Sequence, residues 1–436
     1  GDVNVLAIYG ARKIENDSEN ISLIFLAAAP TAKDRNVFSI NVKRDLIDIS
    51  WNFEAGKRTA EWEPFNFENG DWNCLSCLDE NGLGSVTFED DFRAAVTACN
   101  SNSVSPALSL WDSDLLVWRC NGPDVPFSML VQLNSDNTGF TQNYQILSDN
   151  KRLVENLNQV ELPTRTFGYF PSITGFNFQY EIWTPPNFDI NDSSVQHPLL
   201  VEIYSGPGSQ AVTQSWKFSL SDAYGTSNCK TCFNAVHIKI DTRGSGNAGD
   251  KLMFAVYKKL GWFEKIDMTE FVRALVLNEI SDVASEQQWV NPVVNKINPQ
   301  QVGIGGWAYG GFATTHTMSL GDDVWKCGVS IAALNSRFWY DSIYTEMALQ
   351  QPSQNQEGYE KGQITNQDLE NFKKLKYTMI HGTADDNVHF HNAAMISKAL
   401  IEKGVEFNNY FYADEAHSIN YGPNAKEHVY RLIFRK

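Results

Sequence analysis

Three short segments in the second half of the chain carry residue types that can perform nucleophilic chemistry. Gly306-Trp-Ala-Tyr-Gly-Gly311 has the frame of the G-x-S-x-G turn, which holds a nucleophilic serine between a strand and a helix, but Ala308 occupies the serine position. The segment His381–Asn387 supplies a carboxylate, Asp385, and the segment Asp414–His417 supplies an imidazole, His417. Acid, base and turn together predict a catalytic triad that lacks its nucleophile.

Each segment also has an ordinary structural interpretation. Glycine-rich turns between a strand and a helix are common, and Asp386 or Asn387 could cap a helix that begins near Val388. The catalytic interpretation is favoured by the order nucleophile, acid, histidine along the chain, which is the order in α/β-hydrolases. No nearby serine stands in a comparable turn, whether Ser205, Ser245 or Ser418.

The elements that must position these residues alternate between strand and helix. Short apolar runs typical of buried strands lie at residues 197–206, 236–241, 302–306, 327–332, 377–381 and 408–412. Helical periodicity is visible at Phe263–Ile280 and Val388–Lys403, and a further helix is expected from about Phe312. This alternation predicts a mostly parallel sheet with helices on both faces, where functional groups gather at the carboxyl ends of the strands.

The first part of the chain has a different pattern. Short alternating or apolar runs are separated by clusters of Asn, Asp, Gly and Pro, and the clearest are Ser22–Ala27, Val37–Val42, Ala107–Leu110 and Leu115–Cys120. Turn-bounded strands at this spacing are typical of a sandwich, barrel or propeller. We therefore expect two domains, an all-β region over residues 1–165 and an α/β domain over residues 166–436.

Composition excludes several classes of protein. The 436 residues carry a formal net charge of −17, so the surface repels phosphate backbones and anionic lipid, and nucleic-acid binding is not expected. No run of 18 apolar residues is present, and the first residues do not have the pattern of a signal peptide.

Seven cysteines bear on the compartment. Two C-x-x-C pairs, at residues 74/77 and 229/232, could in principle bind zinc, but they are far apart in the chain, and we expect no metal site. Three glycosylation sequons agree better with disulfides and an oxidising compartment; they lie at Asn16, Asn20 and Asn191.

Several stretches together closely resemble the dipeptidyl peptidase IV family of serine hydrolases. They are Tyr204–Gln210, Asp241–Gly246 with Gly249–Lys251, Gly306–Gly311, Tyr340–Glu346 and His381–Phe390. The similarity runs from the cysteines of the β region nearly to the last residue. It implies an α/β-hydrolase fold preceded by part of a β-propeller, and a family whose members remove N-terminal dipeptides with proline or alanine in second place, without a cofactor.

The resemblance also implies a role for each matching residue. Asp385 would orient His417, the general base, while the Tyr204 hydroxyl and the Tyr309 backbone N–H would form the oxyanion hole. The pocket for the proline or alanine side chain and its surroundings would be formed by Tyr340, Tyr344, Asn387 and Val388, with Asn387 donating to the substrate backbone and Arg337 at the rim. The pairings Cys74–Cys77, Cys99–Cys120 and Cys229–Cys232 are expected, with Cys327 free.

The sequence departs from the family pattern in four places. Ala308 has no oxygen to attack with, and Arg337 stands where relatives usually carry tryptophan beside the proline pocket. The usual cysteine partner of Cys327 is missing. The β region is too short for an eight-bladed propeller, and the paired glutamates that hold a substrate amino group have no counterpart in it. We expect Arg337 to point outward, toward an acidic partner or solvent.

Two explanations of Ala308 remain. A pseudo-peptidase would keep the fold to bind or regulate a peptide or protein, which Arg337 and the short β region favour. An active peptidase whose serine was replaced would keep its other site residues, and Asp385, His417 and Tyr204 are all present. We favour the pseudo-peptidase.

By resemblance we also expect a location outside the cell or in a lumen, secreted or anchored through a segment absent from this chain, and a homodimer.

Overall fold

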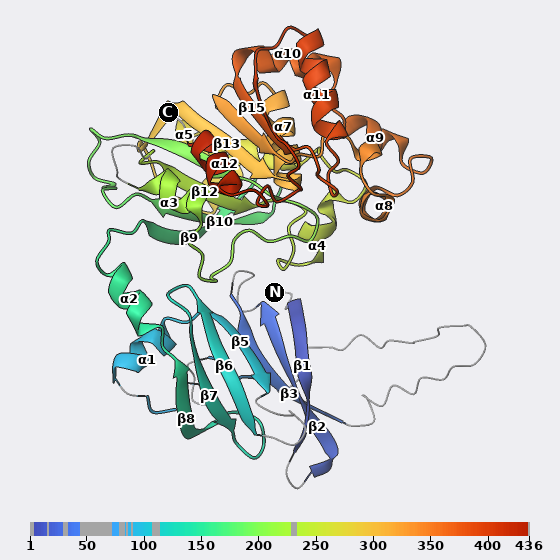
Figure 1. Ribbon diagram of the computed structural model, residues 1–436. Helices are drawn as coiled ribbons and strands as arrows, with labels where there is room; N and C mark the ends of the chain where they lie inside the picture. The colour runs from blue at the N-terminus through green and yellow to red at the C-terminus, as the bar shows by residue number, and fades with distance from the viewer. Residues whose placement is uncertain are drawn as a thin grey trace, which may run out of the picture. The chain divides into compact units, whose positions relative to one another are not determined.

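The computed structural model describes residues 4–14, 17–28, 34–43, 72–77, 83, 86–88, 90–106, 114–227 and 233–434. The chain forms two compact units (Figure 1). The first comprises residues 1–159 together with 213–217, and the second comprises residues 160–212 and 218–436. The sequence predicts a boundary between an all-β domain and an α/β domain near residue 165, and that boundary stays a prediction.

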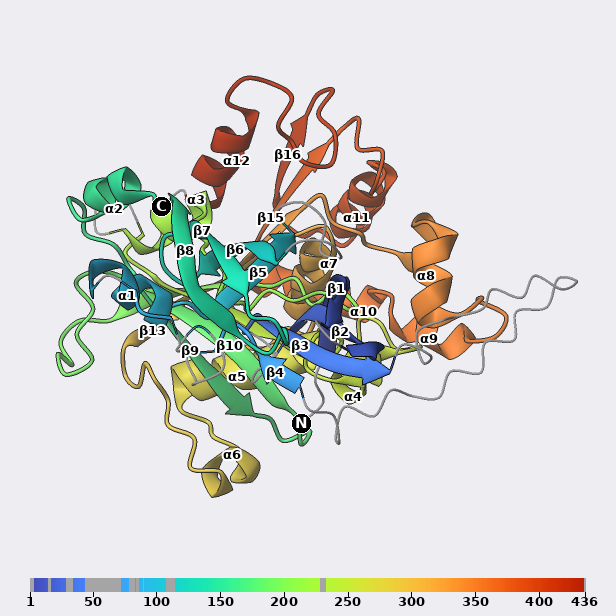
Figure 2. The same ribbon diagram turned by 90° about the horizontal axis from the view of Figure 1, so that it is seen from below.

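Among its described residues the first unit contains two four-stranded antiparallel sheets. Figures 1 and 2 show their strands in the first part of the chain. The strands of the first sheet pair in chain order; they are β1 (Asn4–Ile14), β2 (Asp17–Ala28), β3 (Asn36–Lys43) and β4 (Trp72–Cys74). Those of the second sheet do so too; they are β5 (Ser101–Pro106), β6 (Leu115–Gly122), β7 (Phe127–Leu133) and β8 (Phe140–Ser148). Two short helices accompany them, α1 (Asp90–Thr97) and α2 (Lys151–Leu157).

Alternation along the strands builds the core of this unit. In β7 every second residue from Phe127 is buried, and Trp118 of β6 is completely buried against Phe127, with ring centroids 5.5 Å apart. A pleated strand with one face covered has this period of two. The strands expected around residues 22–27, 37–42 and 115–120 are therefore present, whereas residues 107–110 lie outside the described residues.

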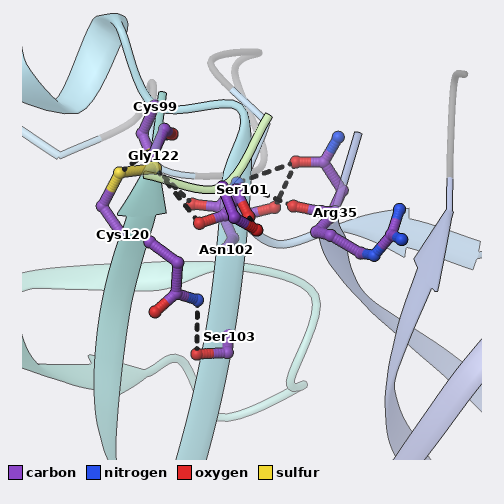
Figure 3. Close-up of a disulfide and its surroundings, with 11 residues drawn as sticks. Arg35, Cys99, Ser101, Asn102, Ser103, Cys120 and Gly122 are labelled. Carbon is purple, nitrogen blue, oxygen red and sulfur yellow. Dashed lines mark hydrogen bonds between the residues drawn. A yellow bond between two sulfur atoms is a disulfide. The ribbon is translucent and has the colours of Figure 1, made fainter. Parts of the chain in front are cut away.

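A disulfide ties the end of the α1 segment to β6. Cys99 bonds Cys120, and beside it the Asn102 side chain donates to the Arg35 carbonyl at 3.0 Å (Figure 3). Cys74 bonds Cys77, so two of the expected pairings are confirmed, and Cys327 is free as expected. The third expected pair, Cys229–Cys232, lies outside the described residues.

The second unit is built on an eight-stranded sheet in the order β16-β15-β14-β13-β11-β12-β10-β9. Its first six strands in that order are parallel, and β10 runs antiparallel to both of its neighbours. The strands are β9 (Thr164–Pro171), β10 (Asn177–Thr184), β11 (His197–Glu202), β12 (Val236–Asp241), β13 (Ile297–Trp307), β14 (Cys327–Ile331), β15 (Lys376–Gly382) and β16 (Asn408–Tyr412).

Helices connect these strands. They are α3 (Leu220–Thr226), α4 (Asp250–Met253), α5 (Glu264–Leu277), α6 (Asp282–Glu286), α7 (Tyr309–Ser319), α8 (Ser342–Leu349), α9 (Gln356–Lys361), α10 (Asn366–Asn371), α11 (His391–Glu402) and α12 (Ala425–Ile433). Figure 2 shows β15 and β16, which pair in parallel, next to each other. No helix among the described residues is long and apolar enough to cross a membrane.

Both faces of the large sheet are covered. Val236, Ile238 and Ile240 of β12 join the core that contains residues of α5, α7 and α11. The alternate residues of β12 point the other way, where His237 meets Asp222 of α3. Ile331 and Ile380 pack on that other side with Val429 of α12. The expected α/β architecture with a mostly parallel sheet is confirmed.

Two details differ from the sequence-based expectations. Helix α7 begins at Tyr309, three residues before the expected start, because the turn leads directly into the helix. Helix α11 begins at His391 rather than near Val388, and neither Asp386 nor Asn387 caps it. Within the described residues the two β sheets do not close into a propeller.

Candidate active site

The turn between β13 and α7 keeps the strained backbone of a nucleophile elbow. Ala308 has φ 54° and ψ −111°, a conformation with positive φ that costs a non-glycine residue on the order of 1–3 kcal/mol. Its N–H donates to the Ile331 carbonyl at 2.9 Å, and its carbonyl accepts from Phe312 N at 3.0 Å. Strand β14 and the first turn of α7 therefore hold residue 308 in place although it carries only a methyl group.

The glycines of this turn are required by close backbone contacts. A Cβ on Gly306 would lie 2.5 Å from the Ile203 oxygen, and one on Gly310 would lie 2.0 Å from the same atom. Real Cβ atoms do not approach carbonyl oxygens so closely, so any side chain here would displace the turn. The sequence pattern at residues 306–311 thus reflects the packing of the elbow against the end of β11.

Asp385 and His417, which the sequence predicts to act as acid and base, lie in hydrogen-bond contact. His417 Nδ1 lies 2.8 Å from Asp385 Oδ2, and Asp385 is buried while His417 is partly exposed. When Nδ1 donates to the carboxylate, Nε2 is left without a proton and can accept one. The pair therefore has the geometry of a general base with its orienting acid.

Further donors fix the Asp385 carboxylate. Its Oδ1 accepts from Asn387 N at 3.0 Å and from Val388 N at 2.8 Å, and His381 Nε2 lies 3.3 Å from Oδ2. Burial by itself would raise the pKa of Asp385, but the hydrogen bonds from His381 and His417 outweigh it and hold that pKa well below its ordinary value. The group stays ionised throughout the neutral range.

The loop that carries His417 is attached directly to the elbow. Trp307, the residue before Ala308, donates its indole N–H to the His417 carbonyl at 2.9 Å. The Lys426 ammonium lies 3.8 Å from the centre of the Trp307 ring and donates to the Ser418 carbonyl. Elbow and histidine are thereby brought together across about 110 residues of sequence.

The loop after β11 presents Tyr204. Asp241, at the end of β12, accepts from Ala211 N at 2.8 Å and Val212 N at 3.0 Å, which anchors the far end of this loop. The Tyr204 ring lies 6.2 Å from the Tyr309 ring, and burial raises the pKa of the Tyr204 hydroxyl. That hydroxyl keeps its proton at neutral pH and can donate a hydrogen bond. Tyr309 N, at the first position of α7, has no carbonyl one turn earlier to bond.

An aromatic cluster lies beside the elbow. Its buried members are Tyr309, Phe312, Leu334 and Val388, and Tyr340 and Tyr344 pack against them while remaining partly exposed. The Tyr340 hydroxyl donates to Asn387 Oδ1 at 2.9 Å, and the rings of Tyr340 and Tyr344 are 5.6 Å apart. The structure therefore brings Tyr340, Tyr344, Asn387 and Val388, which the sequence assigned to the pocket, together with Phe312 and Leu334, which it did not.

The expectation for Arg337 is wrong. The side chain does not point outward: it is 1% exposed, and its guanidinium carbon lies 4.0 Å from the Phe312 ring centre and 4.8 Å from that of Tyr309. None of its three nitrogens has a hydrogen-bond partner. Aromatic faces attract a guanidinium, which offsets part of the cost of burying this charge without a carboxylate.

Sequence reasoning also missed Glu264. This buried carboxylate at the start of α5 accepts from the Tyr309 hydroxyl and from Gly261 N and Phe263 N. Burial and the neighbouring Glu264 raise the pKa of Tyr309 far above its ordinary value. The contact joins residues 45 positions apart, so no local pattern could have revealed it.

One cluster has donor types suited to a metal. Among the described residues, Glu202, Asp222 and His237 place ligand atoms within 4.8 Å of one another. However, Lys239 Nζ lies 3.4 Å from Asp222 and 3.5 Å from Glu202 and already supplies a cation there. The charges of the cluster are balanced within the chain, and it carries no metal proposal.

A mostly parallel sheet with an elbow, an acid and a histidine at the ends of three strands defines an α/β-hydrolase domain of the serine-peptidase type. The model of the prolyl oligopeptidase family matches residues 228–435. The chain belongs to the dipeptidyl peptidase IV family and corresponds to its C-terminal part.

Individual relatives agree with this assignment. The chain is similar to dipeptidyl peptidase 4 of Felis catus, with 34% identity over 314 residues, and to prolyl endopeptidase FAP of Mus musculus, with 33% identity over 317 residues. These matches cover 72% and 71% of this chain but only 37% of either relative. In fold it is similar to Porphyromonas gingivalis dipeptidyl peptidase 4, with a TM-score of 0.69 and 22% identity over 100% of this chain and 49% of that one.

Proposed function

We propose that this chain is a catalytically silent homologue of the serine dipeptidyl peptidases that binds peptides at the Ala308 site. The observation that carries the proposal is the combination of an intact Asp385–His417 pair with an elbow whose central residue has no nucleophilic atom. Removing a triad serine costs about 10⁶-fold in turnover, while binding and oxyanion stabilisation remain. Binding therefore survives where catalysis does not.

The roles of the remaining residues follow from this proposal. A peptide carbonyl above Ala308 would accept from the Tyr204 hydroxyl and Tyr309 N–H, and Asn387 would donate to the peptide backbone. Tyr340, Tyr344 and Val388 would surround one side chain of the peptide. His417 would have no hydroxyl to deprotonate. The occupant is a peptide or the end of a protein chain, and no cofactor takes part.

A second candidate function is an active serine dipeptidyl peptidase, with serine at position 308, that releases N-terminal X-Pro or X-Ala dipeptides. The specific observation in its favour is that Ala308 retains the strained elbow backbone and the Asp385–His417 contact persists. A site without catalytic use is under no pressure to keep either feature.

The compartment is part of the same proposal. Two disulfides and the exposed position of Asn191 support a location outside the cell or in a lumen, where the asparagine can be glycosylated. The protein would be secreted or anchored to a membrane. A homodimer is expected on family grounds.

Binding and turnover, measured on the same preparation, test the proposed function. Calorimetry with short peptides that begin Ala-Pro or Ala-Ala should detect binding to the unmodified chain. Release of the N-terminal dipeptide should not exceed that of a His417→Ala control. Dipeptide release by the unmodified chain that is lost in the His417→Ala variant would contradict a silent site, and absence of binding by every peptide would contradict a peptide-binding one.

A further inference from the structure

The Arg337 guanidinium is the one feature of the aromatic cluster that its apolar character does not explain. A buried guanidinium carries five N–H donors and a full charge, and burying such a group without partners is costly. Here all three nitrogens are buried and without a hydrogen-bond partner, and the guanidinium lies over the rings of Tyr309 and Phe312. A buried guanidinium that is held against aromatic rings without a carboxylate should attract an anion supplied by a ligand.

Two other arginines show how this chain balances such a charge when no ligand is needed. Arg243 lies 3.9 Å from the Phe263 ring centre, and its Nε donates to Asp267 Oδ2 at 2.9 Å. Arg165 stacks 4.6 Å from the Phe167 ring centre and bonds Glu181. Each has a ring and a carboxylate. Arg337 has the rings and lacks the carboxylate.

A buried carboxylate in this region, Glu264, already has other partners. Glu264 accepts hydrogen bonds from the Tyr309 hydroxyl and from two backbone N–H groups. It makes no ion pair with Arg337. Tyr340 and Tyr344 form the partly exposed side of the cluster, and they are the residues that the proposed function places around a peptide side chain. The missing partner would therefore come from the peptide.

We propose that the site selects peptides that bring a carboxylate to Arg337, an inference that rests on the proposed peptide-binding function. The carboxylate would accept the guanidinium N–H groups in a two-pronged ion pair. It could belong to an aspartate or glutamate side chain or to the C-terminus of a short peptide; the chemistry is shared, and the two sources can be separated by experiment.

The test is a calorimetric comparison of four probes on the unmodified chain: Ala-Glu-amide, Ala-Gln-amide, Ala-Gln with a free C-terminus, and Ala-Pro-amide. We expect Ala-Glu-amide to bind at least about tenfold more tightly than its neutral isostere Ala-Gln-amide, since a hydrogen bond to a charged group is worth that much. A similar gain for free Ala-Gln alone would support the carboxylate and identify the C-terminus as its source. Arg337→Met should abolish the gain, and Arg337→Trp should favour Ala-Pro-amide instead.

Stability without ligand supplies a second readout that does not depend on the peptides. Removing an unpartnered buried charge should stabilise the fold, so Arg337→Met should raise Tm. The matched variant Arg243→Met should lower Tm, because it leaves the Asp267 carboxylate buried and unpaired. Equal destabilisation by both variants would mean that the Arg337 charge is already satisfied inside the fold and would overturn the proposal.

The remaining outcomes are also decisive. Equal binding of the Glu and Gln amides, without a gain for the free acid, overturns the carboxylate preference, while binding of Ala-Pro-amide in the same series leaves the peptide-binding function standing. If no peptide binds, both fall. If sodium acetate alone raises Tm as much as Ala-Glu-amide, the site holds an adventitious anion only, and the selection of peptides is refuted.

Discussion

Buried charges within the α/β unit are balanced by partners supplied from neighbouring strands and loops. Asp385 receives two backbone N–H groups and two imidazoles, and Lys239 lies among the carboxylates of Glu181, Glu202 and Asp222. In each case the cost of removing a charge from water is offset by short contacts to hydrogen-bond donors or to the opposite charge. Arg337 departs from this rule, and that departure is the basis for assigning it a ligand.

The buried cluster around His237 predicts a pH-dependent stability. Burial lowers the pKa of His237, but contacts with Asp222 and Glu202 outweigh burial and the nearby Lys239 ammonium, and that pKa is raised above 6.5. A group whose pKa is raised on folding stabilises the fold fully below its unfolded value of about 6.5, and this contribution is lost as the pH rises through the folded value. Between pH 6.5 and 8.5 the free energy of unfolding should therefore fall.

The variant His237→Gln should show a smaller fall over this pH range in urea unfolding titrations. His389→Gln is the matched control, because His389 is an exposed histidine in the same unit. An unchanged pH dependence in the His237→Gln variant, or an equal change in the control, would show that His237 is not the titrating group.

Backbone packing explains where helices α7 and α11 begin better than local sequence periodicity does. Helix α7 starts directly at the elbow because Ala308 N bonds the end of β14 and the glycines allow contact with β11. Helix α11 starts late because Asp385 engages the N–H groups of Asn387 and Val388, which holds residues 385–388 in a turn. At both points a contact required for the site sets where the helix begins.

At the same scale, the Cys99–Cys120 disulfide should stabilise the β unit. The bond joins the segment after α1 to β6 across a separation of 21 residues, and closing a loop of this length is worth about 3 kcal/mol. The double variant Cys99→Ser/Cys120→Ser should lower the free energy of unfolding by about that amount. Denaturant titration of the whole chain with near-UV detection, compared with Cys327→Ser, measures it. A decrease in the free energy of unfolding no larger than that caused by Cys327→Ser would contradict a stabilising role of the Cys99–Cys120 disulfide.

At the scale of the whole molecule, features carried by contiguous sequence could be predicted and those made across the fold could not. Strands such as β12 and β15 are largely buried and appear as apolar runs, and the elbow, acid and histidine each follow a run that can be recognised in the sequence. The burial of Arg337 depends on Phe312 and Tyr309, which come from another element, and the anchoring of Tyr309 depends on Glu264 in a third. Side-chain direction and partners of this kind arise only when distant segments pack together.

The central claim is that strand ends spread over about 110 residues still assemble a working acid–base pair around residue 308. The most direct measurement is covalent labelling by a fluorophosphonate probe, which reacts with activated serines and needs no knowledge of the substrate. The variant Ala308→Ser should be labelled well above the unmodified chain. The double variant Ala308→Ser/Asp385→Asn should be labelled about 10⁴-fold more slowly, because the histidine would then adopt the wrong tautomer. Labelling of Ala308→Ser no greater than that of the unmodified chain would contradict the claim that Asp385, His417 and the elbow remain aligned for catalysis.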